Sequence, residues 1–240
     1  MVMAEATNHH FKHLGLSDGL SQVCIPSIYQ DELGAVWLVT TEGLNRYNGK
    51  DVRVFQPSES NHGLTNNEIN ELCGDKNGRM YIRSGNDLIK LDIYTEQFTC
   101  LRQKGVYGLF CKKDTLWVSC ADGIYYYTGQ GTELTFFARV QKGFVGRALY
   151  VDRETVWVVT RKYLVAISRE DPLRQEILLT LDKGNCILGD SSGNIWVGAW
   201  NGLYRVSPDR ETTAYVSHSG MGELSDNQVR CVLEDDFKHI

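Results

Sequence analysis

The chain has 240 residues, of which 42% are hydrophobic and 10% aromatic, so it is long enough to bury a large core. Its formal net charge is −5, from 30 acidic and 25 basic residues, and we therefore expect no nucleic-acid partner. No run of 18 apolar residues occurs, so we expect no membrane insertion by this segment.

One sequence unit of about 40 residues recurs along the chain. After a flexible tail expected at residues 1–10, units are expected at 22–55, 66–98, 105–137, 145–177 and 184–215, with the start of a sixth at 227–240. Each complete unit has an aromatic residue at an equivalent place, followed seven positions later by an aliphatic residue. These aromatic residues are Trp37, Tyr81, Trp117, Trp157 and Trp196.

Each unit is expected to contain four short strands. The runs 157–160 and 164–167 are rich in β-branched residues and too short for helices. Glycine with Asp or Asn separates such runs, as in 121–123, and makes a tight turn. Four antiparallel strands in about 40 residues are typical of one propeller blade. The predicted fold is therefore all-β, a β-propeller of about five blades plus the start of a sixth.

Both ends of the sequence fall inside repeating units. Aligned on residues 190–195, residues 228–233 form an expected inner strand, and 235–240 stop one position before the next aromatic. Residues 11–16 resemble the outer strand that ends at Tyr215. We therefore expect the chain to be part of a larger propeller. The alternative is a ring of five blades closed by residues 11–16.

The loops that join the second and third strands of each blade are expected to gather on one face, around the axis. Trp200 stands where other units carry Thr, Gly, Ala or Arg, so it either stacks on a sugar ring or packs against an adjacent blade. Basic residues at 161–162 either meet an acidic sugar or form a solvated rim. The predicted ligand-binding residues are Trp200, Asn201, Arg161, Lys162, Asp122 and Asn86.

No catalytic residue, cofactor or metal site is predicted. Ser17 lies in a Gly-x-Ser-x-Gly run, but a strand-like segment follows it where a nucleophile elbow requires a helix. The six histidines lack metal-ligand spacing, and the Asp190 turn lacks the long loop of an EF-hand. Seven cysteines make an odd count without a Cys-x-x-Cys pair, so we expect small buried core residues.

The repeat resembles that of two-component regulator propellers. The pattern Asp-x-x-Gly-x-aliphatic-Trp, followed by Gly-Leu and Tyr, is clearest at 190–204 and 31–47, and Leu-Ser-x-Asn-x-Val is found at 224–229. The opening residues 11–21 resemble the mature N-terminus of the sensor half of Bacteroides-type hybrid two-component systems. Units three and four lack the Asp and Gly of the first turn.

This resemblance implies a periplasmic sensor module of an inner-membrane receptor, in which an oligosaccharide is the ligand. Its partners would be the remaining propeller and C-terminal domains of the same receptor, together with a second subunit in a homodimer. Histidine kinase activity would lie outside this chain. The alternatives are a passive scaffold or dimerisation propeller with the ligand site elsewhere, and a propeller lyase or glycosidase.

Overall fold

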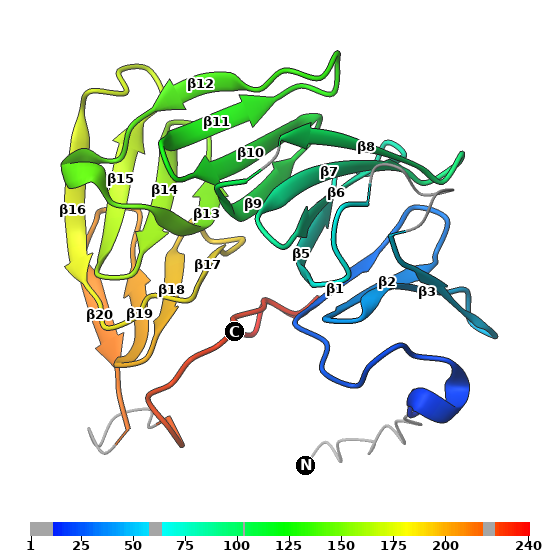
Figure 1. The fold of residues 1–240 in the computed structure, drawn as a ribbon. Helices are drawn as coiled ribbons and strands as arrows, with labels where there is room; N and C mark the ends of the chain where they lie inside the picture. The colour runs from blue at the N-terminus through cyan, green and yellow to red at the C-terminus, as the bar shows by residue number, and fades with distance from the viewer. Residues whose placement is uncertain (1–11, 58–63, 103, 218–223) are drawn as a thin grey trace, which may run out of the picture.

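The computed structural model describes residues 12–57, 64–102, 104–217 and 224–240. These ranges contain five antiparallel sheets of four strands, each with its strands in simple sequence order (Figure 1). The sheets lie side by side as the blades of an open arc, which confirms the predicted all-β propeller fold. Two helical turns of three residues accompany them, and no helix in the described ranges could cross a membrane. The expected tail at 1–10 lies outside these ranges.

The strands of each blade follow one another along the chain. Blade one contains β1 (Ser27–Gln30), β2 (Val36–Thr40), β3 (Gly43–Tyr47) and β4 (Val52–Phe55). Blade two contains β5 (Ile69–Gly74), β6 (Arg79–Ser84), β7 (Asp87–Asp92) and β8 (Gln97–Arg102). Blade three contains β9 (Val106–Lys112), β10 (Thr115–Cys120), β11 (Gly123–Tyr127) and β12 (Thr135–Ala138). Blade four contains β13 (Gly146–Val151), β14 (Thr155–Thr160), β15 (Tyr163–Ser168) and β16 (Gln175–Thr180). Blade five contains β17 (Cys186–Gly189), β18 (Ile195–Ala199), β19 (Gly202–Val206) and β20 (Thr212–Tyr215).

The core lies between neighbouring blades, because each sheet has two apolar faces. Trp37 of β2 belongs to a buried cluster that includes Ile69 and Met80 of blade two. Trp157 of β14 packs in the same way with β18 of blade five. Trp196, at the equivalent place in blade five, is only half-buried, since no described sheet follows it. The aromatic repeat therefore marks the contact that each blade makes with the next.

The Asp of the first turn accepts a hydrogen bond from the repeated Trp, and this bond explains why the two residues recur together. The indole Nε1 of Trp37 donates to Asp31 at 2.8 Å, and that of Trp196 donates to Asp190 at 2.8 Å. Asp152 accepts the same bond from Trp157 at 2.6 Å, so the expectation that unit four lacks this Asp was wrong, and its turn lacks only the glycine. The carboxylate also accepts backbone N–H groups of its own turn, so it fixes both the hairpin and the indole.

The inner strand expected at 228–233 is not formed, which corrects the prediction. The segment still lies beside blade five, where the N–H of Val229 donates to the carbonyl of Ala199 at 2.9 Å. Asn185 Nδ2 donates to the carbonyl of Val229 at 3.1 Å. No described strand offers 228–233 a ladder of hydrogen bonds, and an isolated extended segment is not a stable strand.

The N-terminal segment lies with blade one. Lys12 Nζ donates to the hydroxyl of Tyr47 at 2.7 Å, and η1 (Leu16–Asp18) follows directly. Residues 12–16 form no strand and pair with no strand of blade five. Among the described residues, the alternative of a five-blade ring closed by this segment is therefore not supported. Phe11 lies outside the described ranges.

Candidate functional site

Trp200 and Asn201 form a small cluster with the linker that enters blade five. The backbone N–H of Trp200 donates to the carbonyl of Asp182 at 2.8 Å, and Asn201 Oδ1 accepts from the N–H of Asp182 at 2.9 Å. The ammonium of Lys183 lies 3.4 Å from the centroid of the Trp200 ring. One face of the ring is thus covered by a cation–π contact, while 40% of the residue stays exposed.

Asp122, in the β10–β11 loop, is held by hydrogen bonds from blades two and three. Arg102 Nη2 donates to Oδ1 at 2.9 Å, and the hydroxyl of Tyr125 donates to Oδ2 at 2.8 Å. Partial burial raises the pKa of Asp122, but these two hydrogen bonds outweigh it, so the pKa is lowered. A cavity of about 230 Å³ adjoins this loop and is lined further by Arg139 and Phe144. A carboxylate already held in this way is poorly placed to bind a sugar hydroxyl.

The remaining predicted residues are exposed loop positions. Arg161 and Lys162 accept backbone hydrogen bonds from Gly184 and Leu181 through their carbonyl groups. The carbonyl of Asn86 accepts from the N–H of Val106. The six predicted residues therefore share one face, as the repeat indicated, but they stand on four separate loops, and only Trp200 and Asn201 form one cluster.

A second group of residues, not predicted from the sequence, lies on the innermost strands near the same face. In β5, β9 and β13 the pairing with the second strand skips one residue, and the skipped residues are Asn70, Tyr107 and Arg147. Asn185 takes the same place in blade five, directly before β17, where its N–H donates to the carbonyl of Gly198. These four residues are named the bulge ring here.

Three members of the bulge ring (Tyr107, Arg147 and Asn185) line an axial cavity, since a β-bulge turns its extra side chain away from the regular ladder. The cavity measures about 250 Å³ and is lined by residues of blades two to five: Arg83, Tyr107, Arg147, Gly184 and Asn185. Tyr107 is 38% exposed, and the guanidinium of Arg147 has no partner among the described residues. Aromatic, amide and cationic groups from four blades therefore meet at one place.

The charge at the axial cavity is set by two arginines and one carboxylate. Arg83 Nη1 donates to Asn70 Oδ1 at 3.3 Å, and Arg83 Nε lies 3.4 Å from the carboxylate of Glu71. Burial raises the pKa of Glu71 to about 7, although Arg83 and the N–H of Leu109 act in the opposite direction. Near neutral pH the carboxylate of Glu71 therefore offsets the positive charge of the two arginines only partly. The cavity favours an anionic or hydroxyl-rich ligand for this reason.

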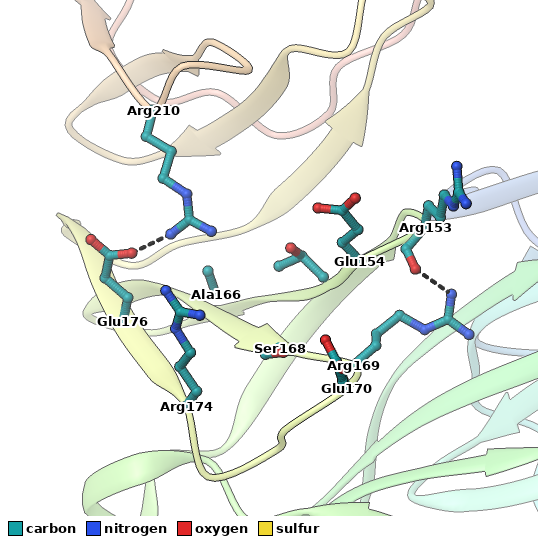
Figure 2. Close-up of a pocket in the computed structure, with 10 residues that line it drawn as sticks. Arg153, Glu154, Ala166, Ser168, Arg169, Glu170, Arg174, Glu176 and Arg210 are labelled. Atoms are coloured by element: carbon teal, nitrogen blue, oxygen red, sulfur yellow. Dashed lines mark hydrogen bonds and ion pairs between the residues drawn. The ribbon is translucent and has the colours of Figure 1, made fainter.

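The opposite face has a larger cleft of about 500 Å³ between blades four and five (Figure 2). Arg210 is paired with Glu176, and Arg169 Nη1 donates to the carbonyls of Asp152 and Arg153 at 3.0 Å each. The cleft therefore mixes both charge signs and uses two of its arginines internally. Because it draws on two blades only, we rank it below the axial cavity as a ligand site.

Among the described residues, neither a cluster of metal ligands nor a nucleophile elbow at Ser17 is found. No group of three or more His, Cys, Asp or Glu side chains in these ranges could hold a metal ion. Ser17 lies in the turn η1, which is followed by coil and β1, so the strand–turn–helix of a nucleophile elbow is absent there.

The bulge ring leaves a signal in the sequence that loop-based reasoning overlooks. Its members recur at intervals of 37, 40 and 38 residues, the period of the repeat. They vary in type, whereas the position directly before each of them is apolar or glycine. A polar or aromatic residue that recurs two positions before an apolar inner-strand residue would have pointed to the axis.

Three comparisons place this fold among known proteins, and no family model matches the chain. A stretch of 55 residues, 23% of the chain, is 34% identical to histidine kinase P4 of Formosa agariphila, of which it covers 4%. The fold is similar to the extracellular domain of a hybrid two-component system of B. thetaiotaomicron, with a TM-score of 0.74 and 23% identity, over 84% of this chain and 31% of that one. It is also similar to virginiamycin B lyase of Staphylococcus aureus, with a TM-score of 0.62 and 12% identity, over 80% and 70% of the two chains.

These similarities confirm the propeller fold and the predicted likeness to extracellular domains of Bacteroides hybrid two-component systems. The chain spans about a third of that extracellular domain and a small part of the kinase. The likeness to a lyase concerns the fold alone.

Proposed function

We propose that this chain is part of the extracytoplasmic sensor domain of a hybrid two-component receptor and contributes a ligand site at the axis of its propeller. The observation that carries the proposal is the axial cavity, to which each of four blades contributes a side chain, two of them (Tyr107 and Arg147) from residues that the strand pairing skips. The similarity to an extracellular domain of such a system supports the setting. The periplasm is the proposed location.

The proposed ligand is an oligosaccharide with an acidic group. An unpaired guanidinium at Arg147 can bind a carboxylate or sulfate in a bidentate manner, and the exposed ring of Tyr107 offers a stacking surface. Asn185 can bind hydroxyl groups through its free amide oxygen, since its Nδ2 is engaged with Val229. The cavity is smaller than a typical drug-sized site, so it suits one terminal sugar unit.

The proposed mechanism is a shift in population between blade arrangements. A ligand that contacts blades two to five at once stabilises the arrangement in which those contacts are all made. Neighbouring domains or a second subunit of the receptor would respond to that arrangement, and the membrane segment of the receptor would transmit it. The kinase and the homodimer belong to the receptor as a whole and are part of the proposal.

Isothermal titration tests this proposal with neutral and acidic oligosaccharides, using both this chain and the complete extracytoplasmic region. We expect Arg147→Ala to weaken binding of an acidic oligosaccharide about 10- to 100-fold, since one charge-assisted contact is lost. Arg153→Ala is the matched control, because it removes an exposed arginine of the same blade on the opposite face. Equal affinities for the two variants would refute the axial site.

The loop residues predicted from the sequence are tested separately by Trp200→Ala combined with Asn201→Ala. If that pair weakens binding and Arg147→Ala does not, the ligand contacts the rim cluster in place of the axis. Binding by the complete region alone would favour the alternative of a scaffold or dimerisation propeller. Turnover of an oligosaccharide by this chain would favour the lyase or glycosidase alternative.

A further inference from the structure

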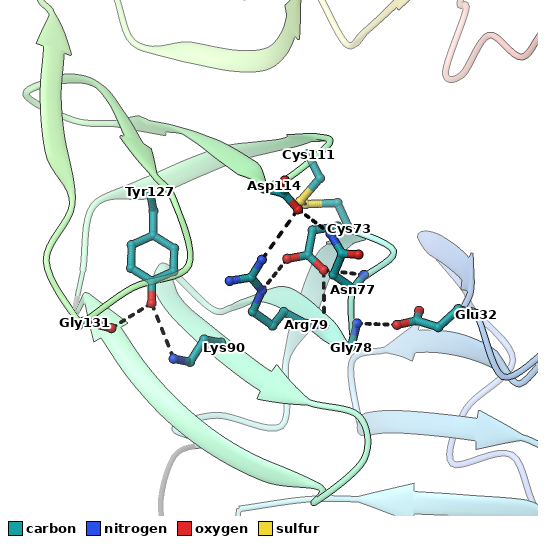
Figure 3. Close-up of polar contacts among 11 residues, drawn as sticks. Glu32, Cys73, Asn77, Gly78, Arg79, Lys90, Cys111, Asp114, Tyr127 and Gly131 are labelled. Atoms are coloured by element: carbon teal, nitrogen blue, oxygen red, sulfur yellow. Dashed lines mark hydrogen bonds and ion pairs between the residues drawn. The ribbon is translucent and has the colours of Figure 1, made fainter.

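Blades two and three meet through a pair of cysteines. Cys73 of β5 and Cys111 of β9 belong to adjacent innermost strands, and their sulfur atoms lie 2.7 Å apart (Figure 3). Both residues are half-buried and both are reduced thiols in this structure. A disulfide bond requires a sulfur separation of about 2.05 Å, so the two side chains need to move by only about 0.6 Å.

Between blades one and two, and between blades four and five, the same contact is made by a large and a small residue. Tyr29 in blade one pairs with Trp37, and its hydroxyl lies over Gly74 of blade two, where an added Cβ would be 2.2 Å from it. Tyr150 lies over Gly189 in the same way, with an added Cβ 2.0 Å from its ring. The tyrosine always pairs with the repeated aromatic of its own blade, and the glycine pairs with the residue before that aromatic.

The two cysteines occupy these equivalent places between blades two and three. Cys73 pairs with Tyr81, the repeated aromatic, and Cys111 pairs with Leu116, the residue before Trp117. A Tyr–Gly contact is thus replaced on both sides by cysteine. Replacing only the tyrosine by a small residue would leave a gap, whereas a sulfur on each side fills it.

Polar contacts beside the sulfurs hold the two blades in register. Asn77 Nδ2 donates to Asp114 of the β9–β10 turn, and Arg79 Nη2 lies 3.9 Å from the same carboxylate (Figure 3). Arg79 also pairs with Asp75 of its own turn. These contacts restrict the relative motion of β5 and β9, so the sulfurs remain within reach of one another.

We propose that Cys73 and Cys111 form an inter-blade disulfide when the chain is exposed to a disulfide oxidant. The inference that this occurs in the cell depends on the proposed extracytoplasmic location, since that compartment is oxidising. The thiolate of one cysteine attacks the oxidant and forms a mixed disulfide, releasing one reduced thiol. The second thiolate then attacks the protein sulfur of that mixed disulfide and releases the second thiol. Two protons leave the cysteines, and their two electrons reduce the oxidant.

The remaining cysteines do not offer a comparable pair. Cys73 with Cys111 is the one sulfur–sulfur contact within hydrogen-bonding distance among the described residues. Cys24 and Cys231 are exposed, Cys120 is buried, and Cys100 and Cys186 are half-buried. An odd total of seven therefore does not argue against one disulfide. Burial and the neighbouring sulfur raise the pKa of Cys73, so oxidation should accelerate as the pH rises from about 7 to about 9.

Oxidation of the purified chain by oxidised glutathione tests the proposal. Thiols are counted after denaturation, and disulfide-linked peptides are identified by mass spectrometry. We expect the thiols of Cys73 and Cys111 to be lost without added glutathione mass, one linked peptide containing both cysteines, and a rise in Tm of about 10 °C, because the bond closes a loop of 38 residues. Cys111→Ser and Cys73→Ala should each abolish the linked peptide and the rise in Tm, whereas the control Cys100→Ser should keep both.

Seven remaining thiols, or a linked peptide from another pair, would overturn the proposal. The result in solution is independent of ligand binding and of cellular location. Failure of the sensor hypothesis would therefore leave the disulfide intact, and the absence of the disulfide would not alter the titrations with oligosaccharides.

Discussion

The hydrogen bond between the turn Asp and the repeated Trp gives a quantitative test of how the blades are held. We consider Asp31→Ala, which removes a carboxylate that is 4% exposed and accepts three hydrogen bonds. The donors are Trp37 Nε1 at 2.8 Å, the N–H of Ala35 at 2.9 Å and the N–H of Leu33 at 3.0 Å. Leu33 is exposed, so water can accept the hydrogen bond of its N–H when the Asp31 carboxylate is removed.

Two buried donors then remain unsatisfied, and each costs about 1–3 kcal/mol. We therefore expect Asp31→Ala to lower the free energy of unfolding by about 3 kcal/mol. Asp31→Asn keeps one acceptor oxygen, and we expect it to cost about 1 kcal/mol. Asp171→Ala is the control, since Asp171 is exposed and accepts a bond from Leu173. Its cost should stay below about 0.5 kcal/mol.

Urea unfolding followed by tryptophan fluorescence measures these differences. A double-mutant cycle with Trp37→Phe isolates the contribution of the indole hydrogen bond to the free energy of unfolding. The substitution removes the donor but keeps an aromatic ring. We expect Asp31→Ala to cost at least about 1 kcal/mol less in the Trp37→Phe background. Equal costs in both backgrounds would show that the carboxylate stabilises the turn alone, and our explanation of the Asp and Trp spacing would be refuted.

Three further predictions follow from glycine packing and from pKa values. Gly74→Ala places a Cβ 2.2 Å from the hydroxyl of Tyr29 and should cost about 2–3 kcal/mol in urea unfolding. In a Tyr29→Leu background that cost should fall below about 1 kcal/mol, and an unchanged cost would contradict the contact. The pKa of Asp190 is lowered, because hydrogen bonds from its turn and from the indole outweigh the effect of burial. Its contribution to stability is thus present above about pH 4 and lost as the pH falls through the folded-state pKa, so Asp190→Ala should lose less stability than wild type between about pH 4 and pH 2. The pKa of Glu71 is raised to about 7, so protonation below that pH frees Arg83, and an acidic oligosaccharide should bind more tightly at about pH 6 than at about pH 8. Glu71→Gln should remove this dependence on pH, and its persistence would assign the titration to another group.

Most of the fold could be predicted because its determinants are local and repeated. Trp37, Tyr81, Trp117 and Trp157 mark the same inter-blade contact, and the Gly and Asp turns between them separate the strands. The segment at 228–233 was predicted wrongly as a strand. Its sequence matches an inner strand, but a strand also requires a partner, which local pattern does not supply.

The candidate site was harder to predict because it depends on register. Tyr107 and Arg147 reach the axial cavity because the pairing skips one residue at each of them, and nothing in the local sequence requires the skip. Trp200 was predicted from its unusual place in a turn, and its contact with Lys183 arises from the linker. The ligand-binding roles of all these residues stay predictions.

The Tyr–Gly contacts also give the blade array a direction. Tyr29 and Tyr150 each project from one blade toward the blade that follows in the chain, and Gly74 and Gly189 receive them. At these two junctions the earlier blade has an edge with a bulky side chain, and the later blade has an edge with a hollow. Duplication of a whole unit preserves this alternation, whereas a duplication that begins out of phase would place two bulky groups in one gap.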